Sequence, residues 1–330
     1  MYLLLLSAII LVLLSVIGLL FRDNDTLGGF ISADAEIEYK MVYDEALIVL
    51  PERTDEQWIN TEFGTVRVYK FAEKETEGKT PLLLLPGKSA STPMWQPNVR
   101  DLMKERLVYT VDLLGEPGLS VQRKKITTAE DQAVWLHEVI ESLPENLFHL
   151  IGHSFGGWNA ANAALFNSNK IESLSLVDPV YVFGPIPLKM ILASIPASVP
   201  FVSRSIREKM LSYIAGGAEA DEREPIAKLI ETGMRTFKSR LPMPAEITPE
   251  KLQKIELPVL GILAENSTMH RSNKAMQVGE KNLVNPLSRM VMFPDASHAI
   301  NGEYPKELAK TVLDFVNEVD NSSSSIDQAR

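Results

Sequence analysis

The sequence contains no cysteine among its 330 residues. Disulfide cross-links, thiolate zinc sites and a cysteine nucleophile are therefore excluded, while the redox compartment stays open. Positive charge is scarce as well, because 33 lysines and arginines face 43 aspartates and glutamates, which gives a formal net charge of −10. A nucleic-acid partner requires a basic face, so we expect no nucleic-acid binding.

Charge is absent from the first 21 residues, MYLLLLSAIILVLLSVIGLLF. A bilayer-spanning helix needs roughly 20 apolar residues, whereas a signal peptide begins with basic residues and has a shorter apolar core. We therefore predict a transmembrane anchor helix over residues 1–21 and a membrane localisation with a single N-terminal pass. Secretion after signal cleavage is the alternative. Residues 22–45 are predicted to form a polar tether.

Short apolar runs alternate with helical patterns along the rest of the chain. The apolar runs lie at 81–87, 106–115, 147–154, 172–179, 257–265 and 288–295. Runs of this length suit strands that are buried on both faces of a parallel sheet. Helical patterns lie near 93–105, 127–142, 155–167, 271–282 and 303–319, and residues 58–71 alternate around Gly64 like a β-hairpin. The alternation predicts an α/β fold with a mostly parallel central sheet flanked by helices.

Residues 182–251 interrupt this alternation, because they carry no strand signal. They contain an apolar, proline-rich stretch and then two charged helical stretches near 204–215 and 220–237. An insertion of this length between two strands favours a helical cap over a plain loop. The core is then formed by residues 46–181 and 252–319, and the serine-rich residues 320–330 are predicted to be a disordered tail.

One short motif suggests chemistry. The sequence Gly152-His153-Ser154-Phe155-Gly156 follows a buried-strand pattern and opens a helical one. Glycines two residues before and after a serine permit a sharp strand-to-helix turn that exposes the hydroxyl above the sheet edge. The alternative interpretation of the same residues is a glycine-rich turn in which the serine only caps the helix. The α/β context favours a serine nucleophile. The N–H of Phe155 is placed to stabilise the oxyanion that forms on the carbonyl oxygen of the substrate.

Four segments together resemble the α/β-hydrolase superfamily, and more closely its bacterial carboxylesterase branch. They are LLLLPGKSASTPMW, DLLGEPGLS, GHSFGG and DASHAINGEYP, and the resemblance covers roughly residues 55–319. It implies an α/β-hydrolase fold with a helical cap inserted between the sixth and seventh strands. It also implies that the N–H of Lys88 is the second oxyanion donor and that His298 is the catalytic base. His270 is the one serious alternative base.

The acid that would orient the base is left open by the sequence. The family usually places an aspartate after the seventh strand, but here that position is Ser267. Asp178, at the end of the sixth strand, is the first replacement, because some members of the superfamily take their acid from there. Glu265 is the alternative acid. A carboxylate that faces a histidine would fix its tautomer.

The resemblance implies a serine hydrolase that cleaves a carboxylic ester through an acyl-enzyme intermediate, without a metal or an organic cofactor. Apolar residues of the cap favour a small-molecule ester with an apolar part; they are Ile186, Leu188, Met190, Ile191, Leu192, Ile195, Phe201 and Val202. A thioesterase, an amidase, an acyltransferase, a C–C bond hydrolase or a non-catalytic binding or signalling protein of the same fold are the alternatives. The oligomeric state stays unknown.

Overall fold

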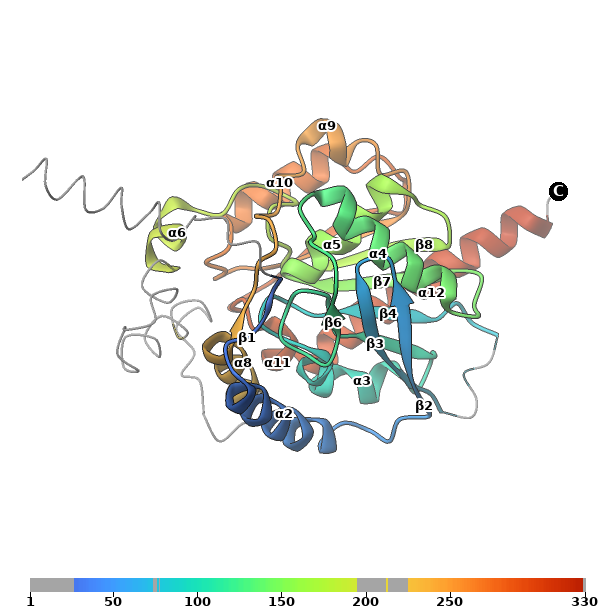
Figure 1. The fold of residues 1–330 in the computed structure, drawn as a ribbon. Helices are drawn as coiled ribbons and strands as arrows, with labels where there is room; N and C mark the ends of the chain where they lie inside the picture. The colour runs from blue at the N-terminus through green and yellow to red at the C-terminus, as the bar shows by residue number, and fades with distance from the viewer. Residues whose placement is uncertain (1–26, 74–75, 77, 195–211, 213–224, 329–330) are drawn as a thin grey trace, which may run out of the picture.

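A computed structural model describes residues 27–73, 76, 78–194, 212 and 225–328. Figure 1 shows helices on either side of a twisted sheet. The strands are β1 Gly29–Phe30, β2 Asp55–Thr61, β3 Gly64–Phe71, β4 Leu82–Leu85, β5 Val108–Val111, β6 Val121–Gln122, β7 Phe148–His153, β8 Ile171–Val177, β9 Phe237–Lys238, β10 Val259–Ala264 and β11 Arg289–Phe293. The helices are α2 Ala33–Ile48, η1 Thr92–Trp95, α3 Gln96–Leu102, α4 Ala129–Ser142, α5 Phe155–Phe166, α6 Leu188–Ser194, α8 Pro225–Thr236, α9 Pro249–Leu252, α10 Ser272–Asn282, α11 Ile300–Glu303 and α12 Pro305–Gln328.

Nine strands of the described residues form one sheet, in the order β11-β10-β8-β7-β4-β5-β3-β2, with β6 paired to β3. The six strands from β11 to β5 are parallel to one another. Strand β3 is antiparallel to β5, β2 and β6. The mostly parallel α/β sheet and the hairpin around Gly64 are therefore confirmed.

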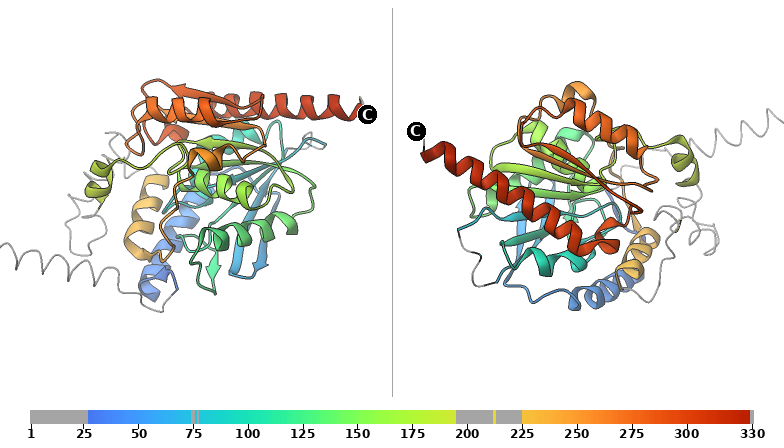
Figure 2. Two further views of the ribbon diagram at one scale, coloured as in Figure 1. Left: turned by 90° about the horizontal axis from the view of Figure 1, so that it is seen from above. Right: turned by 180° about the vertical axis from the view of Figure 1, so that it is seen from behind.

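Strand β4 explains why the central strands are continuous apolar runs. Its residues Leu82 and Leu84 pack in one hydrophobic cluster and Leu83 and Leu85 in another, because successive side chains point to opposite faces of a sheet. Helices α4 and α5 pack on the face of Leu83 and Leu85, and α12 crosses the face of Leu82 and Leu84 (Figures 1 and 2). Because the six central strands are parallel, the loops at their carboxyl ends lie at one edge of the sheet.

Helix α2 corrects the prediction of a polar tether over residues 22–45. Ser32 caps the helix by accepting the N–H of Ala35 at 3.1 Å. Tyr39 and Tyr43 are fully buried, so one side of the helix packs on the core. Helix α2 lies beside α8, and ion pairs such as Lys228–Glu45 link the two (Figure 1).

Helix α12 corrects the prediction of a disordered tail over residues 320–330, because it continues through Gln328. Asp320 accepts hydrogen bonds from Arg106 Nη1 at 2.7 Å and from His149 Nε2 at 3.1 Å. These contacts hold α12 against the sheet at Asp320. The first residue of the predicted tail therefore has partners in the core.

The predicted membrane localisation is also corrected. In the part of the chain that the structure describes, no helix combines the length and the apolar character that a membrane crossing requires. The anchor predicted over residues 1–21 lies outside the described residues. The predicted single-pass localisation is therefore withdrawn.

The segment predicted to form a cap, residues 182–251, lies between β8 and β10. Its described part contains α6, α8, the short strand β9 and α9. The helical stretch predicted near 204–215 lies outside the described residues except for Ser212. The division of the chain into core and cap stays a prediction.

Candidate active site

Ser154 lies on the turn between β7 and α5, in a backbone conformation that residues with a side chain rarely adopt. Its φ is 54° and its ψ is −115°. The flanking glycines make this turn possible: a Cβ on Gly152 would lie 2.3 Å from the carbonyl oxygen of Gly156. A Cβ on Gly156 would lie 2.1 Å from the carbonyl oxygen of Leu85. The strained turn places the serine at the carboxyl end of a central strand.

Three of the predicted side chains meet at this edge. His298, between β11 and α11, lies with Nε2 2.9 Å from Ser154 Oγ. Its Nδ1 lies 2.6 Å from Oδ2 of Asp178, which directly follows β8. Because a carboxylate can only accept, Nδ1 carries the proton and Nε2 is free to accept the hydroxyl proton of Ser154. The arrangement can deprotonate a serine.

Asp178 is completely buried and accepts further hydrogen bonds. Its Oδ1 accepts the N–H of Ala264 at 2.9 Å and that of His270 Nε2 at 2.7 Å. Its Oδ2 also accepts the hydroxyl of Ser267 at 2.6 Å. Burial alone would raise the pKa of Asp178, but hydrogen bonds and the charges of His270 and His298 hold it well below its usual range. The carboxylate therefore stays ionised.

The contacts of Ser267 and His270 with Asp178 could not be assigned from the sequence. Both residues follow β10, and β10 pairs with β8, whose end carries Asp178. Ser267 stands at the position where an acid is expected from the sequence, and its hydroxyl donates to Asp178, which follows the neighbouring strand. The one feature of the sequence that could have indicated these contacts is that both polar residues follow a predicted strand, as Asp178 does.

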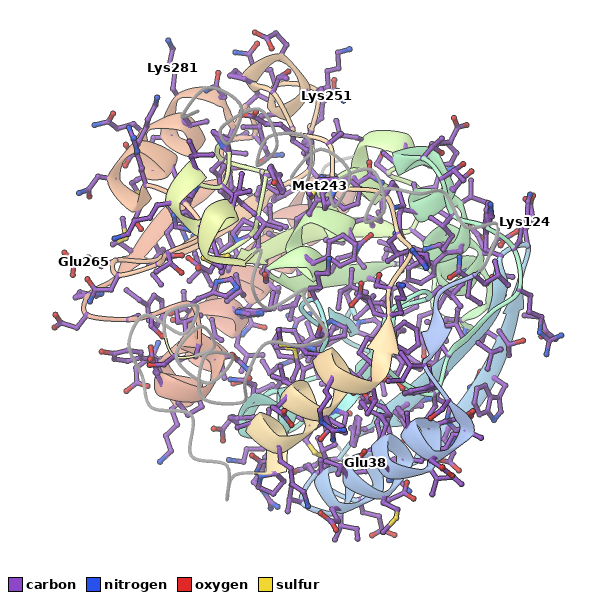
Figure 3. The ribbon with its side chains drawn as sticks, turned by 60° about the vertical axis from the view of Figure 1, so that its left-hand side comes forward. Glu38, Lys124, Met243, Lys251, Glu265 and Lys281 are labelled. Atoms are coloured by element: carbon purple, nitrogen blue, oxygen red, sulfur yellow. The ribbon has the colours of Figure 1, made fainter. Side chains whose placement is uncertain are left out.

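Glu265, the alternative acid, is exposed and lies at the periphery of the molecule (Figure 3). Its Oε2 accepts the N–H of Asp295 at 3.0 Å. Within the described part of the chain, its carboxylate is not hydrogen-bonded to His298. The structure thus brings Asp178, and not Glu265, together with Ser154 and His298.

The two predicted oxyanion donors flank the serine. Phe155 is the first residue of α5, so its N–H belongs to the free N-terminal turn of the helix. Lys88 lies in the loop after β4. A Cβ on the preceding residue, Gly87, would lie 3.4 Å from Ser154 Cβ, so this loop passes directly beside Ser154.

His153 supports the backbone of His298. Its Nε2 donates to the carbonyl oxygen of His298 at 2.8 Å, and the two ring centroids are 4.8 Å apart. Burial, together with the nearby charge of His298, lowers the pKa of His153 to about 4. The neutral ring is therefore a structural support next to Ser154.

No group of three or more histidine, aspartate or glutamate side chains in the described ranges could hold a metal ion. The prediction that the chemistry uses no metal or cofactor stays a prediction.

Known proteins are similar to this chain over most of its length. The alpha/beta hydrolase family matches residues 82–311. Two curated proteins of Bacillus subtilis (strain 168) are similar over most of their length. One is the uncharacterized carboxylesterase nap, with 26% identity over 86% of this chain and 94% of its own. The other is carboxylesterase YbfK, with 23% identity over 87% of this chain and 96% of its own.

A solved structure gives the same result for the fold. The crystal structure of naproxen esterase from Bacillus subtilis superposes with a TM-score of 0.77, at 24% sequence identity, over 86% of this chain and 99% of that chain. This chain belongs to the α/β-hydrolase family.

Proposed function

We propose that the protein is a carboxylesterase in which Ser154 is the nucleophile, His298 the general base and Asp178 the acid that orients it. The protein is an ester-hydrolysing serine hydrolase on the strength of its family and its carboxylesterase relatives. The observation that carries the finer proposal is the hydrogen-bonded chain from Ser154 Oγ through His298 to Asp178, with distances of 2.9 and 2.6 Å.

The reaction runs in two halves. Ser154 Oγ attacks the ester carbonyl carbon while its proton passes to Nε2 of His298. The tetrahedral oxyanion is stabilised by the N–H groups of Lys88 and Phe155. As the intermediate collapses, the alcohol leaves with the proton from His298, and an acyl-enzyme remains. Water, deprotonated by His298, then attacks the acyl group and releases the carboxylic acid and free Ser154.

Asp178 contributes electrostatically. The imidazolium that forms on His298 in each half-reaction lies 2.6 Å from a carboxylate. That carboxylate is fixed by three further donors, from Ala264, Ser267 and His270. Because these groups are already oriented, little reorganisation accompanies the charge that appears on the ring.

An ester with an apolar part fits the residues after β8. Val182 and Phe183 are buried, and Met190 of α6 is buried as well. Leu188 and Ile191 of the same helix are exposed, at 68% and 39%. The two exposed side chains, Leu188 and Ile191, offer an acyl or alcohol group apolar contact area. Ile195, Phe201 and Val202, which belong to the same prediction, lie outside the described residues.

The test is hydrolysis of p-nitrophenyl esters from acetate to dodecanoate by the full chain and by its Ser154→Ala variant. We expect turnover by the parent and a loss of at least about 10³-fold in kcat in the variant. The preferred chain length then gives the size of the acyl site. Equal turnover in parent and variant would refute the proposed nucleophile. No turnover on any ester by a folded parent would refute the esterase.

A further inference from the structure

A carboxylate outside the proposed triad holds the loop that carries Lys88. The N–H of Ser89, the next residue, donates to Glu116 Oε2 at 2.8 Å. Glu116 lies in the loop after β5, the strand beside β4. Its Oε1 accepts the hydroxyl of Ser239 at 2.9 Å. The carboxylate of Glu116 thus joins three segments that are far apart in the sequence.

The loop needs such support because it contains a strained turn. The N–H of Ala90 donates to the carbonyl oxygen of Gly87 at 3.2 Å and closes a four-residue turn. The third residue of this turn, Ser89, has a φ of 58°. A positive φ at this place usually calls for glycine, and it costs another residue about 1–2 kcal/mol. The bond from Ser89 to Glu116 helps to hold this conformation.

The same turn sets the direction of the oxyanion donor. The carbonyl of Gly87 and the N–H of Lys88 belong to one planar peptide and point in opposite directions. Because Gly87 accepts from Ala90 within the turn, the N–H of Lys88 points away from the turn. Its direction therefore depends on the turn that Ser89 completes.

Glu116 is only 1% exposed, and a buried carboxylate is costly unless its hydrogen bonds are satisfied. Burial raises the pKa of Glu116, while the charge of Lys88 and the bonds from Ser89 and Ser239 act in the opposite direction. A second buried carboxylate, Asp112, accepts the N–H of Thr92 at 2.8 Å. The loop after β4 and the start of η1 are thus held by two acids that follow β5.

Helix α8 encloses the turn from the outside. A Cβ on Gly233 would lie 3.1 Å from the carbonyl oxygen of Ser89 and 2.9 Å from Pro117 Cγ. The backbone of α8 therefore packs directly against Ser89. The turn is confined between this helix and Glu116.

We propose that Glu116 is a positioning residue for the oxyanion hole, which fixes the turn 87–90 and thereby the direction of the Lys88 N–H. The inference rests on the proposed function, in which that N–H stabilises the oxyanion. Without the carboxylate, the N–H of Ser89 loses its hydrogen-bond partner, and the turn relaxes. The donor is then displaced in the transition state, so kcat falls while KM changes little.

The first test compares three variants of the full chain, with rates expressed per fluorophosphonate-titrated active site. Glu116→Met keeps the side-chain volume without an acceptor, and we expect a loss of roughly 10²-fold in kcat with KM within about threefold. Glu116→Gln keeps an acceptor oxygen for Ser89 and should stay within about fivefold of the parent. Ser239→Ala leaves the Ser89 bond intact and should stay within about threefold. An unchanged kcat in Glu116→Met, or an equal loss in Ser239→Ala, would overturn the assignment.

A second readout is independent of ester hydrolysis. Hydrogen–deuterium exchange of peptides that cover residues 86–92 should accelerate at least about tenfold in Glu116→Met and stay close to the parent in Glu116→Gln. Equal protection in both variants would overturn the proposal even if the parent is an active esterase. Inactivity of the parent on all esters, with faster exchange in Glu116→Met alone, would refute the proposed function and leave Glu116 as the residue that holds the turn.

Discussion

At the scale of single residues, the choice between Asp178 and Glu265 depends on position more than on chemistry. Both are carboxylates at the carboxyl ends of strands. Asp178 is completely buried and lies 2.6 Å from His298, whereas Glu265 is exposed and caps a turn at Asp295. Only a buried carboxylate that faces the ring can fix its tautomer and stabilise the imidazolium.

This contrast gives the first prediction. Asp178→Asn should lower kcat by roughly 10⁴-fold, because the neutral amide favours the wrong tautomer of His298. Glu265→Gln is the matched control, and we expect kcat within about threefold of the parent. Stopped-flow or steady-state hydrolysis of one p-nitrophenyl ester measures both. Similar losses in the two variants would contradict Asp178 as the single acid.

For the candidate site, the sequence predicts the local turn at Ser154 but leaves the choice between Asp178 and Glu265 open. The glycine spacing around Ser154 predicts the local turn, because this turn has no room for a Cβ at Gly152 or Gly156, where it would overlap backbone atoms. The contacts around Asp178 depend on the pairing of β8 with β10, which brings distant loops together. Strand order across a sheet is not encoded in local spacing, so Ser267 and His270 could not be assigned as donors.

At the scale of secondary-structure elements, the sequence predicts a strand or helix correctly where its apolar residues follow one regular pattern of burial. Strands β4 and β7 and the helix α5 lie where continuous apolar or small-residue runs predict them. Helix α2 was missed because its apolar residues do not share one side: Tyr39 and Tyr43 are buried, while Ile37 and Met41 are exposed at 58% and 62%. Without one apolar stripe, the helical period is not visible.

The end of helix α12 provides the second prediction. Arg106 is 1% exposed, and Asp320 is its carboxylate partner at 2.7 Å. Asp320→Asn should reduce the free energy of unfolding by about 2 kcal/mol, below the usual cost of breaking a buried pair because Asp320 is partly exposed. Urea unfolding followed by circular dichroism measures this change.

The same helix contains the control for this experiment. Asp314 pairs with Lys310 on the outside of α12, with side chains 58% and 75% exposed. Asp314→Asn should change the free energy of unfolding by less than about 0.5 kcal/mol, because exposed pairs contribute little. If the two aspartate variants were equally stable, the contact with Arg106 would not hold the end of the helix.

At the scale of the whole molecule, stability at acid pH is set by groups whose pKa values differ between the folded and unfolded states. His153 has a folded pKa of about 4, lowered mainly by burial. The ordinary value for an unfolded histidine is about 6.5. Between these two values the unfolded chain binds a proton that the folded protein does not. The stability that neutral His153 supports is therefore present above about pH 6.5 and is lost as the pH falls toward 4.

The last prediction isolates this contribution. Asp112 and Glu116, whose pKa values are raised by burial, act in the opposite sense, because the folded protein takes up their protons first on acidification. The net pH profile of the parent is therefore not a clean test, but its difference from a His153→Gln variant is. Glutamine can still donate to the carbonyl of His298 and does not titrate. We expect the stability advantage of the parent over His153→Gln to shrink by about 3 kcal/mol from pH 7 to pH 4, measured by urea unfolding. A difference that stays constant over this range would mean that His153 takes up its proton over the same pH range in the folded protein as in the unfolded chain, and its proposed role as a neutral support beside Ser154 would be wrong.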